Sequence, residues 1–259
     1  MSTEFVRSGQ GEPLVLLHGV GLDHRLWDDL VPLLEPRFDV LRYDLLGHGE
    51  AAPLSAPVRP EDFCLQLDQV LDRAGLAQAH VLGYSMGGLI AGCYAATRPS
   101  RVKRLALLST VFQRTAAESQ AVRARLAGAA TQEAEAAAEI SLARWFTPAF
   151  RQARPDRVRE IGRRLVANRR SSFLHAYRMF ALGDGLLQPA AIGCPVLVMT
   201  GADDVGSTPR MSQALAAGLP DAQLAIVPGQ RHMLPVEDPA AVASALHGFM
   251  LTTTAIPSA

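Results

Sequence analysis

The sequence lacks a net charge, because its 25 lysine and arginine residues are balanced by 25 aspartate and glutamate residues over 259 positions. Proteins that bind nucleic acid usually carry an excess of positive charge or a strongly basic surface. The balance therefore argues against a nucleic-acid partner. It favours a small-molecule substrate.

Membrane, export and disulfide signals are also scarce. No run of about 18 consecutive apolar residues occurs, and the first residues lack the basic segment and apolar core of a secretory leader. The three cysteines, Cys64, Cys93 and Cys194, have neither the number of a disulfide framework nor the spacing of a zinc site. We therefore expect a cytoplasmic protein without a membrane partner. Its oligomeric state is left open, a homo-oligomer included.

What the sequence does contain is a series of short apolar runs separated by helical patterns. Runs of this kind predict strands buried on both faces of a parallel sheet, and they lie at 14–17, 40–43, 81–83, 105–109, 196–200 and 224–227. Helical patterns lie between them, at 60–74, 86–97, 209–218 and 239–250. The alternation predicts an α/β fold with a doubly wound, mostly parallel sheet.

The alternation stops between residues 112 and 188, where the chain is rich in alanine and arginine and has no strand-like run. We interpret 112–188 as a helical cap inserted between two strands of the core. The core itself is then formed by residues 1–111 and 189–259. A chain of this length has room for one large domain with such an insertion.

A G-x-S-x-G element, Gly83-Tyr84-Ser85-Met86-Gly87, lies between a predicted strand and a predicted helix. At such a turn the serine is held in a strained conformation, and glycines are needed on either side for the turn to close. The turn predicts Ser85 as a nucleophile, with the N–H of Met86 as an oxyanion donor. The alternatives are a phosphate-binding turn or mere close packing.

The second oxyanion donor is expected from His18-Gly19-Val20-Gly21, which ends the first strong apolar run. A small, flexible turn there lets the N–H of Val20 point toward the same oxygen as that of Met86. We interpret His18 itself as a residue that stabilises the turn rather than as a catalytic group.

A serine nucleophile needs a base, and the base needs an orienting carboxylate. His232 follows the last predicted strand, and Asp203 and Asp204 follow the strand before it. Both loops leave the carboxyl edge of a parallel sheet, so both can reach Ser85. We predict His232 as the base and Asp204 as the acid. Asp203 remains the alternative, because two adjacent carboxylates in one loop cannot be separated by periodicity.

These motifs resemble the α/β-hydrolase superfamily over nearly the whole chain. The matching segments are LLHGVGLDHRLW, YDLLGHGE, GYSMGG, GADD and PGQRHMLPVEDP. The family usually has its acid third after the loop glycine, which implies Asp204. The segment GADDVGSTP departs from the common pattern by an extra residue before Thr208, and this keeps Asp203 open.

A narrower resemblance lies in the cap, where the segment from Arg144 to Phe150 reads RWFTPAF. It is similar to the RWFTPxF segment of 3-oxoadipate enol-lactonases, and YRMFALGD is similar to the segment that follows there. The resemblance implies hydrolysis of an enol-lactone that carries carboxylates, without a metal or an organic cofactor. It also suggests Arg144 and Trp145 as substrate-binding residues.

The expected reaction is hydrolysis of a small ester or lactone through an acyl-enzyme. The alternatives are a hydrolase of C–C bonds in aromatic ring-cleavage products, a general carboxylesterase, and a small-molecule receptor of the same fold. Haloalkane dehalogenase and epoxide hydrolase chemistry needs an aspartate where Ser85 stands. Between Arg144 and Arg178 ten arginines stand against two acidic residues, Asp156 and Glu160, which predicts an anionic substrate.

Overall fold

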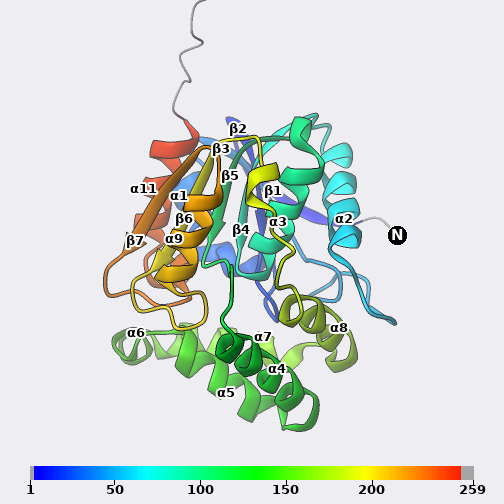
Figure 1. Cartoon of the computed structure of the whole chain (residues 1–259), viewed down its shortest axis with the longest axis vertical. Coiled ribbons are helices and arrows are strands. Elements are labelled where there is room, and N and C mark those ends of the chain that lie inside the picture. The colour runs from blue at the N-terminus through cyan, green and yellow to red at the C-terminus, as the bar shows by residue number, and fades with distance from the viewer. Residues whose placement is uncertain (1–2, 252–259) are drawn as a thin grey trace, which may run out of the picture.

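The computed structural model describes residues 3–251 and contains a seven-stranded sheet covered by helices on both faces (Figure 1). The strands lie side by side in the order β1-β3-β2-β4-β5-β6-β7. Only β1 runs antiparallel to its neighbour. The predicted α/β class with a mostly parallel, doubly wound sheet is confirmed. The strands are β1 (Phe5–Gly9), β2 (Glu12–Leu17), β3 (Phe38–Tyr43), β4 (Ala79–Tyr84), β5 (Val102–Leu108), β6 (Val196–Gly201) and β7 (Ala222–Val227).

Two layers of helices cover the sheet. One face carries α2 (Pro60–Arg73), α3 (Met86–Thr97) and α9 (Pro209–Gly218). The other carries the 3-10 helix η1 (His24–Asp29), α1 (Val31–Leu34), α10 (Leu234–Glu237) and α11 (Pro239–Met250). Two short 3-10 turns, η2 (Pro99–Arg101) and η3 (Pro189–Ala191), precede β5 and β6.

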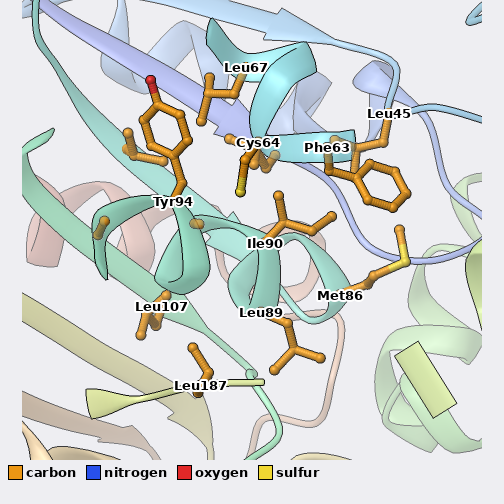
Figure 2. Close-up of a cluster of buried hydrophobic side chains, with 14 of the residues drawn as sticks. Leu45, Phe63, Cys64, Leu67, Met86, Leu89, Ile90, Tyr94, Leu107 and Leu187 are labelled. Carbon is orange, nitrogen blue, oxygen red and sulfur yellow. The ribbon is translucent and has the colours of Figure 1, made fainter. Parts of the chain in front are cut away.

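Alternate residues of the central strands fill two separate cores. In β2, Val15 and Leu17 face the α2 and α3 side, whereas Leu14 and Leu16 face the α11 side, and all four are fully buried. Burial of both faces explains why these strands read as continuous apolar runs. Figure 2 shows the first core, where side chains of α2 and α3 meet.

Two strands differ from the sequence-based expectation. β1 was not predicted, because Phe5–Gly9 is mostly exposed and contains no apolar run. β7 was predicted as a strand buried on both faces, and that part is wrong. It is the edge strand beyond β6, and Leu224 keeps 42% of its surface exposed. An edge strand has one neighbour instead of two, so its side chains are less covered.

Five helices form a layer of their own across the carboxyl edge of the sheet (Figure 1). They all fall within 112–188, between β5 and β6. The last residues of the predicted core segment 189–259 lie outside the described residues. They are α4 (Ala116–Thr131), α5 (Ala134–Trp145), α6 (Pro148–Ala153), α7 (Pro155–Ala167) and α8 (Arg170–Ala181). Within 3–251 no helix is long and apolar enough to cross a membrane.

Candidate active site

Ser85 occupies the sharp turn between β4 and α3. Its φ of 54° and ψ of −113° are a conformation that residues with a side chain rarely adopt. A Cβ at Gly83 would lie 2.4 Å from the carbonyl oxygen of Gly87, and one at Gly87 would lie 2.2 Å from that of Leu17. Both flanking positions therefore require glycine. The close approach lifts Ser85 onto the carboxyl edge of the sheet.

Ser85, His232 and Asp204 form a continuous hydrogen-bonded chain. His232 Nε2 lies 3.2 Å from Ser85 Oγ, and His232 Nδ1 lies 2.7 Å from Asp204 Oδ2. An ionised carboxylate only accepts, so Nδ1 donates to Asp204 and Nε2 accepts the proton of the serine hydroxyl. The three residues follow β4, β7 and β6, and all are at least nine-tenths buried.

Asp204 is held as a carboxylate by its surroundings. Burial opposes its ionisation, but His232 and the N–H groups of Gly206 and Ser207 outweigh it and keep the pKa of Asp204 below its ordinary value. Those two N–H groups donate to Oδ1 at 2.7 and 2.9 Å. Asp203 is exposed, and its backbone N–H donates to Gln230. The structure thus places Asp204, and not Asp203, against His232.

Two contacts that the sequence did not indicate hold the His232 loop. Ser109 donates from its hydroxyl to the His232 carbonyl at 3.2 Å, with its own φ at 45°. The N–H of Met233 donates to the carbonyl of Trp145 at 3.1 Å, and the Trp145 ring lies 6.1 Å from the His232 ring. Ser109 is the last residue of the predicted strand at 105–109, which does not indicate a contact with His232. Trp145 therefore contacts the catalytic loop from the cap.

The two predicted oxyanion donors lie next to Ser85. Met86 is the first residue of α3, where a helix offers no acceptor for the backbone N–H. Val20 lines the same cavity as Ser85. A Cβ on the preceding Gly19 would lie 3.3 Å from that of Ser85, so this turn packs directly against the nucleophile. The arrangement fits the expected oxyanion hole, which stays a prediction.

His18 lies under this turn and is fully buried. Its Nε2 accepts from the N–H of Leu45 at 2.9 Å, so the proton is on Nδ1, which donates to the Gly19 carbonyl at 2.8 Å. His48 packs edge-on against it at 5.2 Å. Burial lowers the pKa of His18, and burial together with His18 lowers that of His48 to about 3.

These buried histidines predict a loss of stability in acid. An unfolded histidine titrates near pH 6.5, so between there and about pH 3 the unfolded chain binds a proton that folded His48 does not. Each such group lowers the free energy of unfolding by about 1.4 kcal/mol per pH unit as the pH falls. The free energy of unfolding can be measured with urea at pH 6, 5 and 4 and plotted against pH. His48→Leu should reduce the slope of that plot by about 1.4 kcal/mol per pH unit. Equal slopes for the variant and the wild type would refute this origin.

The cavity beside the three residues has a volume of about 70 Å³. Its walls combine the core loops with cap residues of α4, α5, α7 and α8, including Trp145 and Tyr177. Arg144, expected to face inward, lines it. So do Arg114 and Arg125, which sequence reasoning missed, because nothing in an arginine-rich cap marks the ones that face inward. Arg114 pairs with Asp184 at 2.9 Å.

Such an arrangement can transfer an acyl group. The hydroxyl of Ser85 can lose its proton to His232 as it attacks a carbonyl, while the charge that develops on the imidazole is stabilised by Asp204. The backbone N–H groups of Val20 and Met86 remain the predicted donors to the oxyanion. Within residues 3–251 no group of three or more His, Cys, Asp or Glu is arranged to hold a metal ion.

Several known proteins are similar to this chain in sequence and in structure. The profile of the family described as alpha/beta hydrolase fold matches residues 12–156. An (E)-2-((N-methylformamido)methylene)succinate hydrolase from Acinetobacter baylyi is 32% identical, over 97% of this chain and 95% of that protein. 3-oxoadipate enol-lactonase 2 from the same organism is 27% identical, over 92% of this chain and 88% of that protein. The enol-lactonase of Burkholderia xenovorans has a crystal structure that matches with a TM-score of 0.86 and 26% identity, over 96% of each chain.

Proposed function

The chain belongs to the alpha/beta hydrolase fold family and is a hydrolase, and from that premise we propose that it cleaves a small ester or lactone through an acyl-enzyme on Ser85. The observation that carries the proposal is the chain of hydrogen bonds from Ser85 through His232 to Asp204. It supplies a nucleophile, a base and an orienting carboxylate in one buried line.

In the first step Ser85 Oγ bonds to the scissile carbonyl carbon while His232 Nε2 takes the hydroxyl proton. The carbonyl oxygen becomes an anion beside the N–H groups of Val20 and Met86. When the intermediate collapses, the C–O bond to the leaving oxygen breaks and His232 returns the proton to that oxygen. In a lactone this oxygen stays attached to the same molecule, and in an enol-lactone the enol formed can tautomerise to a ketone.

In the second step His232 takes a proton from water, whose oxygen attacks the acyl carbon. Collapse of this intermediate returns the proton to Ser85 and releases the acid. His232 therefore acts as base and then as acid in each half of the cycle. Asp204 stays ionised throughout and keeps Nδ1 protonated.

We further propose that the substrate carries a carboxylate that Arg144 binds, with Trp145 as an apolar wall. Arg144 lines the active-site cavity, and a guanidinium binds a carboxylate with two parallel hydrogen bonds. The names of two relatives, a succinate derivative hydrolase and a 3-oxoadipate enol-lactonase, describe substrates of this kind. They support an acidic lactone or ester over a neutral ester.

This substrate class can be tested with mono-p-nitrophenyl adipate and its methyl ester, which share one leaving group and differ in one charge. At low salt we expect kcat/KM to be at least about tenfold higher for the acid, and less so at high salt. Arg144→Ala should remove most of that advantage. The exposed cap residue Arg159, which pairs with Asp156, gives the matched control Arg159→Ala.

Equal kcat/KM values for the two substrates at low salt would contradict the carboxylate proposal. So would an advantage that Arg144→Ala leaves unchanged. A general carboxylesterase would then describe the protein better.

A further inference from the structure

Two guanidinium groups in the wall of the active-site cavity, those of Arg125 and Arg144, have no carboxylate partner among residues 3–251. The Nε of each is buried without a hydrogen-bond partner. Arg42 and Arg101 also bury an unpartnered Nε, but these two form ion pairs through their Nη atoms, with Asp28 and Asp72. The pair in the active-site wall therefore stands out by its missing counter-charge.

The acidic side chains nearest the cavity are already engaged. Asp184 binds Arg114 and the hydroxyl of Ser119, Glu118 binds Arg210, and Asp204 binds His232. Burying positive charge without a counter-charge is unfavourable. A ligand with negative charge could pair with the guanidinium groups of both arginines, whose Nε atoms are buried without a partner.

The two arginines approach the cavity from different helices. Arg144 comes from α5 and lies beside the catalytic loop, since its Nη1 and His232 Nδ1 both lie 3.9 Å from where a Cβ on Gly206 would be. Arg125 comes from α4. Burial lowers the pKa of the Arg144 guanidinium, and the positive charge of Arg125 lowers it further. The two guanidinium groups thus line one cavity from two different helices.

Arg125 also borders a second, larger cavity of about 320 Å³ inside the cap, between α4, α5, α7 and α8. The two cavities share the side chains of Arg125, Ser141, Leu165, Phe173 and Tyr177 as a common wall. Arg125 therefore borders both cavities, and it lines the Ser85 cavity together with Arg144.

We propose that Arg125 and Arg144 form a subsite for two carboxylates, so that the substrate is a lactone or ester with two free carboxylates in addition to the scissile carbonyl. Arg144 binds the carboxylate nearer the reacting carbonyl, and Arg125 binds the distal one. The identity of the reacting group rests on the proposed function. The recognition of a dianion rests on the two unpaired guanidinium groups alone.

The experiment is direct binding, by calorimetry at low salt, of diacids and monoacids of equal carbon number: succinate and butyrate, glutarate and valerate, adipate and hexanoate. We expect at least one diacid to bind about tenfold or more tightly than its monoacid. Arg125→Met should abolish that difference, and Arg144→Met should weaken both members of the pair. Arg123→Met, an exposed arginine on the same helix, should leave diacid binding and hydrolysis of p-nitrophenyl acetate unchanged.

Equal affinities within all three pairs in the wild type would overturn the proposal without recourse to any variant. An Arg125→Met protein that folds and still prefers the diacid would overturn it as well. Hydrolysis of p-nitrophenyl acetate is followed in the same samples. Its absence beside intact diacid binding would count against the serine hydrolase alone, whereas hydrolysis without diacid preference would count against the dicarboxylate subsite alone.

Discussion

Ser85→Ala is expected to lower kcat by about 10⁴-fold or more while the protein remains folded, because the variant has no atom that can form the acyl bond. The residual rate would come from substrate binding and from the oxyanion donors. Alanine can take the same backbone conformation as serine at a φ of 54°, so the turn should persist. Steady-state hydrolysis of p-nitrophenyl acetate and a thermal unfolding curve measure the two parts of this expectation.

Ser109→Ala is the matched control. Ser109 is likewise buried with a positive φ, but its hydroxyl donates to the backbone carbonyl of His232 instead of its ring. Loss of this hydrogen bond should lower kcat by about tenfold or less, because the change only loosens the loop that positions the base. Comparable losses in the two variants would show that disturbance of the site, and not loss of a nucleophile, explains the Ser85 result.

Asp204→Asn is the second large effect, with an expected fall in kcat on the order of 10³ to 10⁴. The amide carries no charge to stabilise the imidazolium, and its NH2 group can hold His232 in the wrong tautomer, with the proton on Nε2 facing Ser85. Asp203→Asn makes the same chemical change, carboxylate to amide, at the neighbouring exposed residue. It should stay within about threefold of the wild type, as a surface change away from the site should.

The pH–rate profile separates the role of Asp204 from simple disruption. A variant that has lost only the orienting carboxylate should regain part of its rate at alkaline pH, because hydroxide can then take the proton of the serine hydroxyl in place of the misoriented imidazole. If Asp203→Asn shows the large loss and Asp204→Asn does not, the orienting role belongs to Asp203.

The central strands and helices of the fold could be predicted because their burial determines the local pattern of apolar residues. Strands buried on both faces are apolar at most positions, so β2 to β6 could be predicted from their apolar runs. Helix starts were marked by proline, as at Pro60, Pro209 and Pro239. β1 carries no such mark, since it pairs through its backbone at an edge and exposes most of its side chains.

Part of the candidate site could also be predicted from the sequence, and part could not. Loops after parallel strands share one edge of the sheet, so Ser85, His232 and the Asp203–Asp204 pair could be placed together from sequence alone. Which aspartate faces His232 depends on the turn: the N–H of Asp204 bonds to Gly201 and that of Asp203 to Gln230, which sends the two side chains different ways. Sequence spacing contains no information about that turn.

Arg125 could not be predicted from the sequence. α4 is rich in alanine and buries only Val122, so no apolar stripe marks its inward face. An arginine on such a helix gives the same pattern whether it faces solvent or a cavity. Its place in the wall of the Ser85 cavity depends on how the cap helices pack over Ser85, which local sequence does not show.

The most direct test of the account is to react the protein with diisopropyl fluorophosphate and locate the label by peptide mass spectrometry. Fluoride leaves as the serine oxygen bonds to phosphorus, so the reagent marks an activated nucleophile. We predict one phosphoryl group per chain, on Ser85, with loss of hydrolysis in proportion to labelling and no label on Ser85→Ala. Full hydrolytic activity in protein labelled at Ser85, or inactivation with the label on another residue, would contradict the assignment of Ser85 as the nucleophile.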